Sequence, residues 1–440
     1  MFRIFFILFL FVNLAAATSL VERGKIALDR GKYEDAMALF ERAIKLDPEN
    51  AEAYLNRGNV FSYQGDFKNG EKDYLKAIEL DEKYNAVYYN LGKLYEKTGD
   101  LQKALEYYTQ AIKIDPKYTD SYINRGVIYS DMGENEKAIE DYTQALKINQ
   151  NLPFAYNNRA SLYSELKEYD KALADLNQAI KIAPNFPMAY RNIGDVYRKT
   201  GEYNKALKNY NKALKLVPNF VAVYCGRAQI YIAIGKKTEA FKDFEIAIAY
   251  DPNNRCIYLE RADFYRSLGE YQNAVNDYTK LIELKNEKFS YGEYTNRAFL
   301  LAKLNRHEEA IGDYEKALEI GGDENALIYR NIAISCTKLN DYKKAIVYYG
   351  KSIELNASNA EIYFNRGYAY WTFDDFPNAI ADFTKAIEIN PNYLGAYANR
   401  CGVYYQAGDA KKATQDAKKA CELGDCKPLE HLKSIGSFVE

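Results

Sequence analysis

The chain repeats a similar segment about every 34 residues along most of its 440 residues. The segments 51–58, 119–126 and 360–367 each contain a tyrosine, one intervening residue and then Asn-Arg-Gly. Residues 18–427 can be divided into about twelve such repeats. A fixed period of this size predicts a stacked repeat protein, because each repeat can bury its apolar face only against its neighbours.

The composition argues against nucleic-acid binding and catalysis. The 59 basic and 61 acidic residues give a net charge of −2 and are interspersed, which differs from the basic surface of a nucleic-acid-binding protein. There are 42 tyrosines but only two histidines, His307 and His431, and they are isolated from each other. The sequence contains neither a phosphate-binding glycine loop nor His-Glu-x-x-His. We therefore predict no catalytic residues, no metal site and no cofactor.

The first 17 residues have the features of a secretory signal peptide. Arg3 precedes an apolar run from Ile4 to Val12, and the small residues Ala15-Ala16-Ala17 follow. This order of charge, apolar stretch and small residues is typical of a leader that is cleaved on export. We predict cleavage near Ala17, with retention as a membrane anchor as the alternative. After cleavage we expect no membrane span.

The six cysteines all lie in the second half of the chain and do not follow a zinc-binding spacing. Cys336 and Cys401 occupy positions that are apolar or small in other repeats, which predicts buried thiols. Cys421 and Cys426 flank the end of the last repeat, and an oxidising compartment would allow them to pair. The sequence leaves both the disulfide and the free thiols open, because it does not give their geometry.

Each repeat has the pattern of two helices joined by a tight turn. In residues 85–118, Tyr88, Leu91, Gly92 and Tyr95 recur at helical spacing, and Gly99 then ends the first helix. Eight repeats carry glycine at this turn position, and the other four carry Lys167, Asn305, Asn340 and Asp374. Asparagine and aspartate tolerate the left-handed backbone that such a turn requires. The pattern therefore predicts an all-α chain of antiparallel helix pairs.

This pattern resembles the tetratricopeptide repeat family over about 410 of the 440 residues. The resemblance implies an α-solenoid in which the pairs form a right-handed superhelix, with a concave groove lined by the first helix of each pair. Phe289-Ser290 and one residue near Asn325 are insertions that should disturb the superhelix locally. Residues 428–440 read as a capping helix and tail.

Arginine and aspartate occur together in the repeats. Three repeats replace the arginine with Leu91, Ile193 or Ile332, and all three also lack the aspartate sixteen residues later. Because the two charges occur together, we predict a structural ion pair between the two helices of one repeat. The predicted pairs are Arg57/Asp73, Arg125/Asp141, Arg159/Asp175, Arg227/Asp243, Arg261/Asp277, Arg297/Asp313, Arg366/Asp382 and Arg400/Asp416.

An asparagine precedes the arginine position in most repeats. The resemblance places this asparagine in the groove, where it is similar to the asparagine ladder of the O-linked N-acetylglucosamine transferases. A carboxamide both donates and accepts, so a row of them can hold a peptide backbone. The alternative is hydrogen bonding within the repeats. The row consists of Asn56, Asn90, Asn124, Asn158, Asn192, Asn296, Asn331, Asn365 and Asn399.

Residues beside the asparagines would give specificity. In the middle repeats these positions are polar and include Arg191, Asp195 and Arg198. In the C-terminal repeats they are aromatic, which suits an anchor pocket, although some of these rings could pack between repeats instead. The aromatic candidates are Phe299, Phe364, Tyr368, Trp371 and Tyr405.

The sequence therefore predicts a non-enzymatic scaffold or adaptor that binds a protein or an extended peptide in its groove. The leader places it outside the cytoplasm, periplasmic or secreted, with a bacterial cell envelope as the preferred setting. The alternative is a co-chaperone or regulatory subunit of an enzyme complex in an endoplasmic reticulum lumen. The sequence indicates neither the identity of the partner nor the oligomeric state.

Overall fold

The computed structural model describes residues 2–284, 290–321 and 325–439, and the side chains from residue 13 onward. Phe289, the first residue of the predicted insertion, lies outside the described residues. The described residues contain helices and no strand. They form two compact units, unit 1 over Met1–Ile230 and unit 2 over Tyr231–Glu440.

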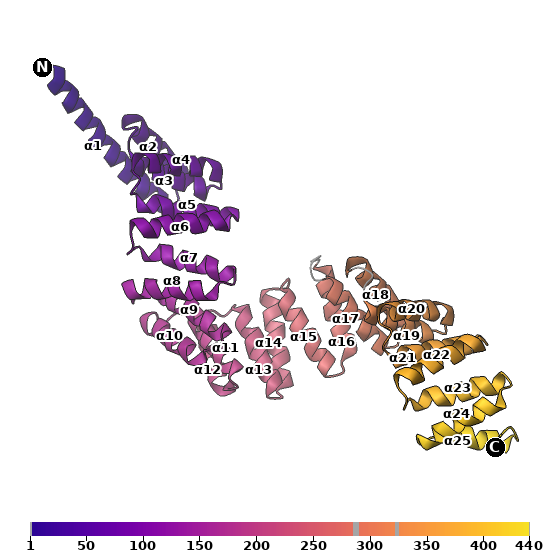
Figure 1. Cartoon of the computed structure of the whole chain (residues 1–440). Coiled ribbons are helices and arrows are strands. Elements are labelled where there is room, and N and C mark those ends of the chain that lie inside the picture. The colour runs from indigo at the N-terminus through magenta and orange to yellow at the C-terminus, as the bar shows by residue number, and fades with distance from the viewer. Residues whose placement is uncertain (1, 285–289, 322–324, 440) are drawn as a thin grey trace. The chain divides into compact units, whose positions relative to one another are not determined.

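Unit 1 is a series of consecutive helices that pack in pairs, drawn from indigo to magenta in Figure 1. The final helix of the series, α13, crosses the boundary between the two units. The helices are α1 (Phe2–Asp29), α2 (Tyr33–Leu46), α3 (Ala51–Tyr63), α4 (Phe67–Leu80), α5 (Asn85–Thr98), α6 (Leu101–Ile114), α7 (Thr119–Asp131), α8 (Asn135–Ile148), α9 (Pro153–Glu165), α10 (Tyr169–Ile182), α11 (Pro187–Lys199), α12 (Tyr203–Leu216) and α13 (Val221–Ala233).

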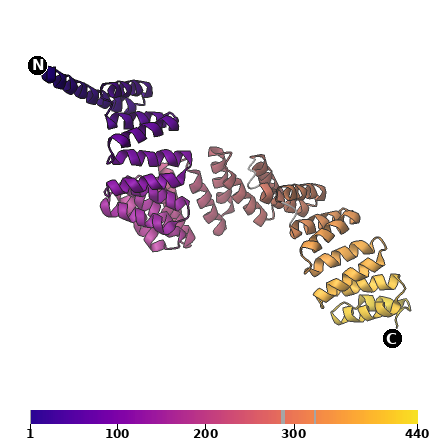
Figure 2. The same ribbon diagram turned by 45° about the horizontal axis from the view of Figure 1, so that its top comes forward.

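Unit 2 continues the same arrangement and ends in a short additional helix, α25. Figure 2 shows its consecutive helices lying side by side from a second direction. The helices are α14 (Lys237–Tyr250), α15 (Arg255–Ser267), α16 (Tyr271–Glu283), α17 (Ser290–Lys303), α18 (His307–Gly321), α19 (Ala326–Lys338), α20 (Tyr342–Leu355), α21 (Ala360–Trp371), α22 (Phe376–Ile389), α23 (Leu394–Gln406), α24 (Ala410–Glu422) and α25 (Lys427–Ser434).

A large aromatic ring on the second helix packs against a small residue on the first helix. Tyr108 of α6 is fully buried, and a Cβ atom added to Gly92 of α5 would lie 2.5 Å from its ring. Gly58 and Tyr74 have the same relation in the preceding pair, at 2.7 Å. The two helices can therefore approach closely only because this position is small, and the ring fills the space between them.

The turn between paired helices adopts the left-handed backbone that its residues predict. All eight turn glycines have positive φ, for example +84° at Gly99. Within the described residues, the non-glycine residues with positive φ are Lys167, Asn305, Asn340 and Asp374, between 58° and 63°. These four occupy the same turn position as the glycines, so the conformation belongs to the repeat and not to one residue type.

The two ends of the chain are helical. Helix α1 runs without interruption through Ala17, and Ala17 is buried in an apolar cluster with Val21 and Phe40. Among the described residues, no helix combines the length and the apolar character needed to cross a membrane. At the other end, Leu432 of α25 is buried against Cys401, Ala413 and Ala417, so α25 covers an apolar face of the last helix pair.

Candidate functional site

The structure brings seven of the eight predicted arginine–aspartate pairs together. Arg125 donates from Nε and Nη2 to the Asp141 carboxylate at 2.8 and 2.7 Å. Arg227 and Asp243 are divided between the two units, and their pairing stays a prediction. The paired arginines hold the two helices of a repeat together. The other six pairs, with nitrogen–oxygen distances between 2.6 and 2.8 Å, are Arg57–Asp73, Arg159–Asp175, Arg261–Asp277, Arg297–Asp313, Arg366–Asp382 and Arg400–Asp416.

Burial and pairing both affect the pKa values of the arginines and aspartates in these pairs. The hydrogen bonds to Asp73 raise the pKa of the Arg57 guanidinium against the opposing effect of burial. Burial raises the pKa of the Asp141 carboxyl, although the hydrogen bonds from Arg125 lower it. Each charge of a pair is therefore balanced by its partner inside the repeat.

The burial of the aspartates also removes them from any surface that a ligand can reach. The sequence predicts that Asp313, Asp382 and Asp416 of the C-terminal repeats form structural ion pairs. They are only 7%, 6% and 5% exposed, and each carboxylate accepts two hydrogen bonds from the arginine of its own repeat. These three residues are thus part of the fold and not of a binding site, although they lie in the repeats that carry the aromatic candidates.

The same arginines also bind the preceding helix pair, which sequence reasoning missed. Arg125 Nη1 donates to Thr109 of α6 at 2.9 Å, and three further arginines reach an equivalent threonine. These contacts are Arg159–Thr143, Arg297–Thr279 and Arg400–Thr384, at 2.9, 3.0 and 2.8 Å. The sequence feature that indicates these contacts is a threonine about half a repeat before the arginine. Each such arginine therefore joins two successive repeats as well as two helices.

Most of the asparagine row is hydrogen-bonded within the protein. Asn56 donates to the Glu52 carbonyl at 2.8 Å, Asn90 to Asn59 Oδ1 at 3.1 Å, and Asn192 to Asn157 Oδ1 at 2.9 Å. The other partners are the hydroxyls of Tyr89 and Tyr108 for Asn124, that of Tyr314 for Asn331, and Asn157 for Asn158. The bond from Asn56 to the Glu52 carbonyl lies within its own repeat, as in the alternative interpretation, whereas the partners of Asn90, Asn124, Asn192 and Asn331 lie in the preceding repeat. Asn296, Asn365 and Asn399 are half-buried.

An aromatic group gathers at the start of α20, on α21 and in the turn that follows α21, in unit 2. Tyr368 and Trp371 are edge to face, with ring centroids 6.3 Å apart. Tyr342 contacts Tyr368 and Phe373, at 6.5 and 6.2 Å. Tyr368 and Phe373 are 40% and 46% exposed. We call Tyr342, Tyr368, Trp371 and Phe373 the Trp371 patch; the sequence had indicated only two of its members.

Trp371 is held in a fixed orientation within this patch. Its indole N–H donates to Gln406 Oε1 at 2.6 Å. A Cβ atom added to Gly402 of α23 would lie 2.9 Å from the indole Cη2, so the ring rests against the backbone of the next repeat. One side of the indole is thus used in packing between repeats, and the bond to Gln406 fixes its plane.

The other aromatic candidates do not form one pocket. Phe364 is half-buried between Phe383 and Tyr393, with ring centroids 5.7 and 4.9 Å away. It therefore packs between repeats and is not an open anchor position. Phe299 lies on α17, two helix pairs before α21, and Tyr405 lies edge to face with His431 at 6.4 Å.

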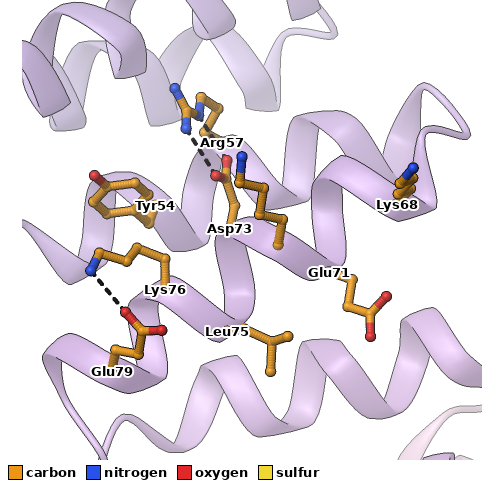
Figure 3. Close-up of a pocket in the computed structure, with 9 residues that line it drawn as sticks. Tyr54, Arg57, Lys68, Glu71, Asp73, Leu75, Lys76 and Glu79 are labelled. Atoms are coloured by element: carbon orange, nitrogen blue, oxygen red, sulfur yellow. Dashed lines mark hydrogen bonds and ion pairs between the residues drawn. The ribbon is translucent and has the colours of Figure 1, made fainter.

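The surface of unit 1 has several hollows, and the one in Figure 3 lies over the second helix α4. Most of the charged side chains that line this hollow interact with neighbouring residues. Arg57 pairs with Asp73, Lys76 pairs with Glu79 at 2.8 Å, and Glu71 accepts from the Tyr95 hydroxyl. Other hollows lie between first helices, and one of them is lined by residues of α9 and α11.

Family models match the chain along most of its length, and each of them describes the tetratricopeptide repeat. One matches residues 51–84, 86–118, 119–152, 153–186 and 360–393. Others match 24–65 and 194–235, 221–254 and 257–288, and 290–358. The chain belongs to the tetratricopeptide repeat family. A search of curated proteins gave no match.

Several solved structures are similar to this tetratricopeptide repeat chain. A tetratricopeptide repeat protein from Parabacteroides merdae ATCC 43184 is 24% identical, with 57% of this chain and 98% of that chain covered and a TM-score of 0.49. PilF of Pseudomonas aeruginosa is 20% identical, with 47% and 94% covered and a TM-score of 0.44. YrrB, described as having an unusual peptide-binding site, is 23% identical, with 42% and 95% covered and a TM-score of 0.37.

The cysteines of this tetratricopeptide repeat chain fall into two groups. Cys421 and Cys426 form a disulfide between the end of α24 and the start of α25. Cys336 and Cys401 are buried, and burial raises the pKa of each thiol to about 11. In the part of the chain that the structure describes, no group of three or more His, Cys, Asp or Glu residues is arranged to hold a metal ion.

Proposed function

We propose that the chain is a non-enzymatic scaffold that binds an extended peptide segment of a partner protein, and that the Trp371 patch is the anchor. Aromatic side chains that are exposed together are unusual on a surface without a partner. Aromatic residues also dominate the binding energy of protein interfaces, because they bury a large area at low entropic cost. The exposed Tyr368 and Phe373 beside Trp371 are the observation that carries the proposal.

The fixed orientation of Trp371 supports an anchor role. A side chain that is already held before binding loses little conformational freedom when a ligand arrives. Gln406 and the backbone at Gly402 hold the indole in this way. Asn365 lies on the same helix and is half-buried. Its amide can donate to or accept from a peptide backbone next to the rings.

The test is peptide selection on the full-length chain, followed by titration of variants. Decapeptides selected from a random phage-display library would be synthesised and titrated by fluorescence anisotropy. Trp371→Ala should weaken their binding by on the order of 2 kcal/mol, as expected for a hot spot. Asn365→Ala should cost about 1 kcal/mol, the value of a neutral hydrogen bond.

The matched control is Tyr63→Ala in unit 1. Tyr63 is 59% exposed and stacks on Tyr33, with centroids 5.9 Å apart, so the substitution removes a similarly exposed ring from another repeat. It should leave the affinity within about twofold, because a surface ring outside the binding site contributes little. Equal losses in the two folded variants, checked by circular dichroism, would contradict an anchor at Trp371.

We also propose that the protein acts outside the cytoplasm, on the basis of the leader over residues 1–17. The Cys421–Cys426 disulfide supports this proposal, since disulfides persist mainly in oxidising compartments. Mass spectrometry of the native protein should give a mature start at Thr18 or within a few residues of it. Intact Met1 on protein from a cytoplasmic fraction would contradict export.

A further inference from the structure

A short connection in unit 2 carries a tripeptide that the repeat fold does not require. Residues 356–359 join α20 to α21, and the first three of them are Asn356, Ala357 and Ser358. Asparagine followed by any residue except proline, and then by serine or threonine, is the acceptor pattern for N-linked glycosylation. No other asparagine of the sequence stands in this pattern.

The equivalent connections of other repeats show what the fold needs here. Within the described residues, nine connections of four residues join successive helix pairs. Six of them have proline at the second position, which is common after a helix because proline cannot continue it. The third position holds glutamate, lysine or asparagine except at Ser358. A second-position proline and a third position without a hydroxyl each exclude the acceptor pattern. The nine connections are 47–50, 81–84, 115–118, 149–152, 183–186, 217–220, 251–254, 356–359 and 390–393.

The turn geometry accounts for Asn356 but not for Ser358. Asn356 Oδ1 accepts a hydrogen bond from the backbone N–H of Ser358 at 3.1 Å. Asp115 and Asn149 accept the same bond in their own connections, at 2.9 Å each, so the turn uses a side-chain oxygen at the first position. The Ser358 hydroxyl adds a second bond to Asn356 Oδ1 at 2.7 Å. Since the other turns form without a hydroxyl at the third position, the serine is not needed for the turn.

The atom that would carry a sugar is accessible. All three side chains of the tripeptide are exposed, as a bulky oligosaccharide requires. Both hydrogen bonds of the Asn356 carboxamide end on Oδ1, so Nδ2 has no hydrogen bond in the part of the chain that the structure describes. The next residue but two, Asn359, caps α21 by accepting from the Glu361 N–H at 2.9 Å. A group added at Nδ2 therefore extends outward and displaces none of these contacts.

We propose that Asn356 carries an N-linked oligosaccharide. The inference rests on the proposed location outside the cytoplasm, because this acceptor pattern is used on surface loops of secreted proteins. The donor is an oligosaccharide joined through its C1 atom to a diphosphate, and a separate transferase catalyses the step. Asn356 Nδ2 forms a bond to C1, and the bond between C1 and the diphosphate oxygen breaks. The diphosphate leaves with that electron pair, and Nδ2 loses one proton.

The attachment point lies away from the Trp371 patch. Asn356 precedes the first residue of α21, whereas Trp371 is its last residue. Helix α21 has 12 residues, so its two ends are about 18 Å apart. Tyr342, at the start of α20, contacts Phe373 and therefore lies at the Trp371 end as well. The oligosaccharide thus adds a bulky, solubilising group to the opposite end of this helix pair.

The test is peptide mass spectrometry of the native protein, purified from the cells that make it. Trypsin releases residues 352–366 as one peptide. Its mass should be raised by one or more whole sugar residues, and electron-transfer fragmentation should place the increment on Asn356 and not on Asn359 or Asn365. Ser358→Ala, expressed in the same cells, should abolish the increment. Ser358→Thr keeps the hydroxyl and should retain it.

The matched control is Asn392→Ser, which places a serine after Asn390 in an equivalent connection but keeps Pro391 between them. Asn390 should stay unmodified in this variant, because proline at the second position excludes the pattern. Trp371→Ala should leave the increment at Asn356 unchanged, so peptide binding and glycosylation are tested separately.

The N-terminal peptide is identified in the same sample, so that export and glycosylation are also separated. An unmodified 352–366 peptide in protein that begins near Thr18 would overturn this inference and leave export intact. Intact Met1 on the purified protein would contradict both. An increment that survives Ser358→Ala would likewise overturn the inference, because the modification would then not depend on the acceptor pattern.

Discussion

At the scale of single residues, the arginine–aspartate pairs are the clearest case of a charge that belongs to the fold. Arg125 contacts Asp141 in its own repeat and Thr109 in the preceding one. Its guanidinium also lies over the Tyr122 and Tyr129 rings, 5.9 Å from each centroid. A conspicuous row of arginines is therefore accounted for by packing.

The chain itself suggests how to test the Arg125–Asp141 pair. The preceding repeat has Leu91 and Tyr107 at the two equivalent positions. The Arg125 and Asp141 side chains are only 16% and 5% exposed, and removing one partner of a buried pair costs about 3–5 kcal/mol. Asp141→Tyr alone should thus strongly destabilise the chain in urea unfolding. Arg125→Leu combined with Asp141→Tyr should recover most of the loss, because no unpaired charge remains.

The Thr109 contact provides the control for that experiment. Thr109→Val removes one hydrogen bond to Arg125 but leaves the ion pair, and it should cost about 1 kcal/mol. If the double variant is as unstable as the sum of its two single variants, the pair is not a coupled unit and the internal comparison between repeats is misleading.

At the scale of helices, the sequence predicted the elements well because the same residue pattern recurs in each repeat. The small residue at Gly92, the ring at Tyr108 and the turn at Gly99 each have one steric role, and the same role recurs along the chain. Lys167 adopts the left-handed turn with φ of 63° although its side chain does not favour it. The packing of the two helices therefore determines the turn conformation, and the residue adapts to it.

The candidate site was less predictable, since the groove positions differ between repeats. Asn90 and Asn192 looked like ligand-binding residues because of their position, but their partners Asn59 and Asn157 lie on the preceding first helices. Such contacts are difficult to predict from the sequence, because the two partners lie far apart in the chain. Phe364 likewise resembled an exposed anchor, and the ring of Tyr393 that covers it lies in the next repeat.

At the scale of the whole molecule, stacking makes the tyrosines a distributed core. Tyr108, Tyr142, Tyr210, Tyr278, Tyr314 and Tyr349 are among the largest fully buried side chains, and they occupy the same position in six of the repeats. Burial is the main cause that raises the pKa of these phenols, to about 12 for Tyr314 and Tyr349. Stability at high pH should therefore depend on the tyrosines of many repeats together.

This arrangement predicts the direction of alkaline unfolding. A tyrosine in the unfolded chain ionises with a pKa near 10. Since the folded-state pKa is higher, the native state holds protons that the unfolded state releases, and the stabilisation present below pH 10 is lost as the pH rises towards 12. Each buried phenol whose pKa rises in this way should contribute on the order of 2 to 3 kcal/mol to this loss.

The measurement is a parallel titration of phenolate absorbance at 295 nm and helical circular dichroism at 222 nm. Exposed rings such as Tyr63 should ionise near pH 10 while the helical signal is unchanged. The remaining phenolate absorbance should appear only with loss of the helical signal, and more steeply than a single group allows, because unfolding releases several buried tyrosines at once. Complete ionisation near pH 10 with the helices intact would show that the rings are not buried as the stacked repeats require.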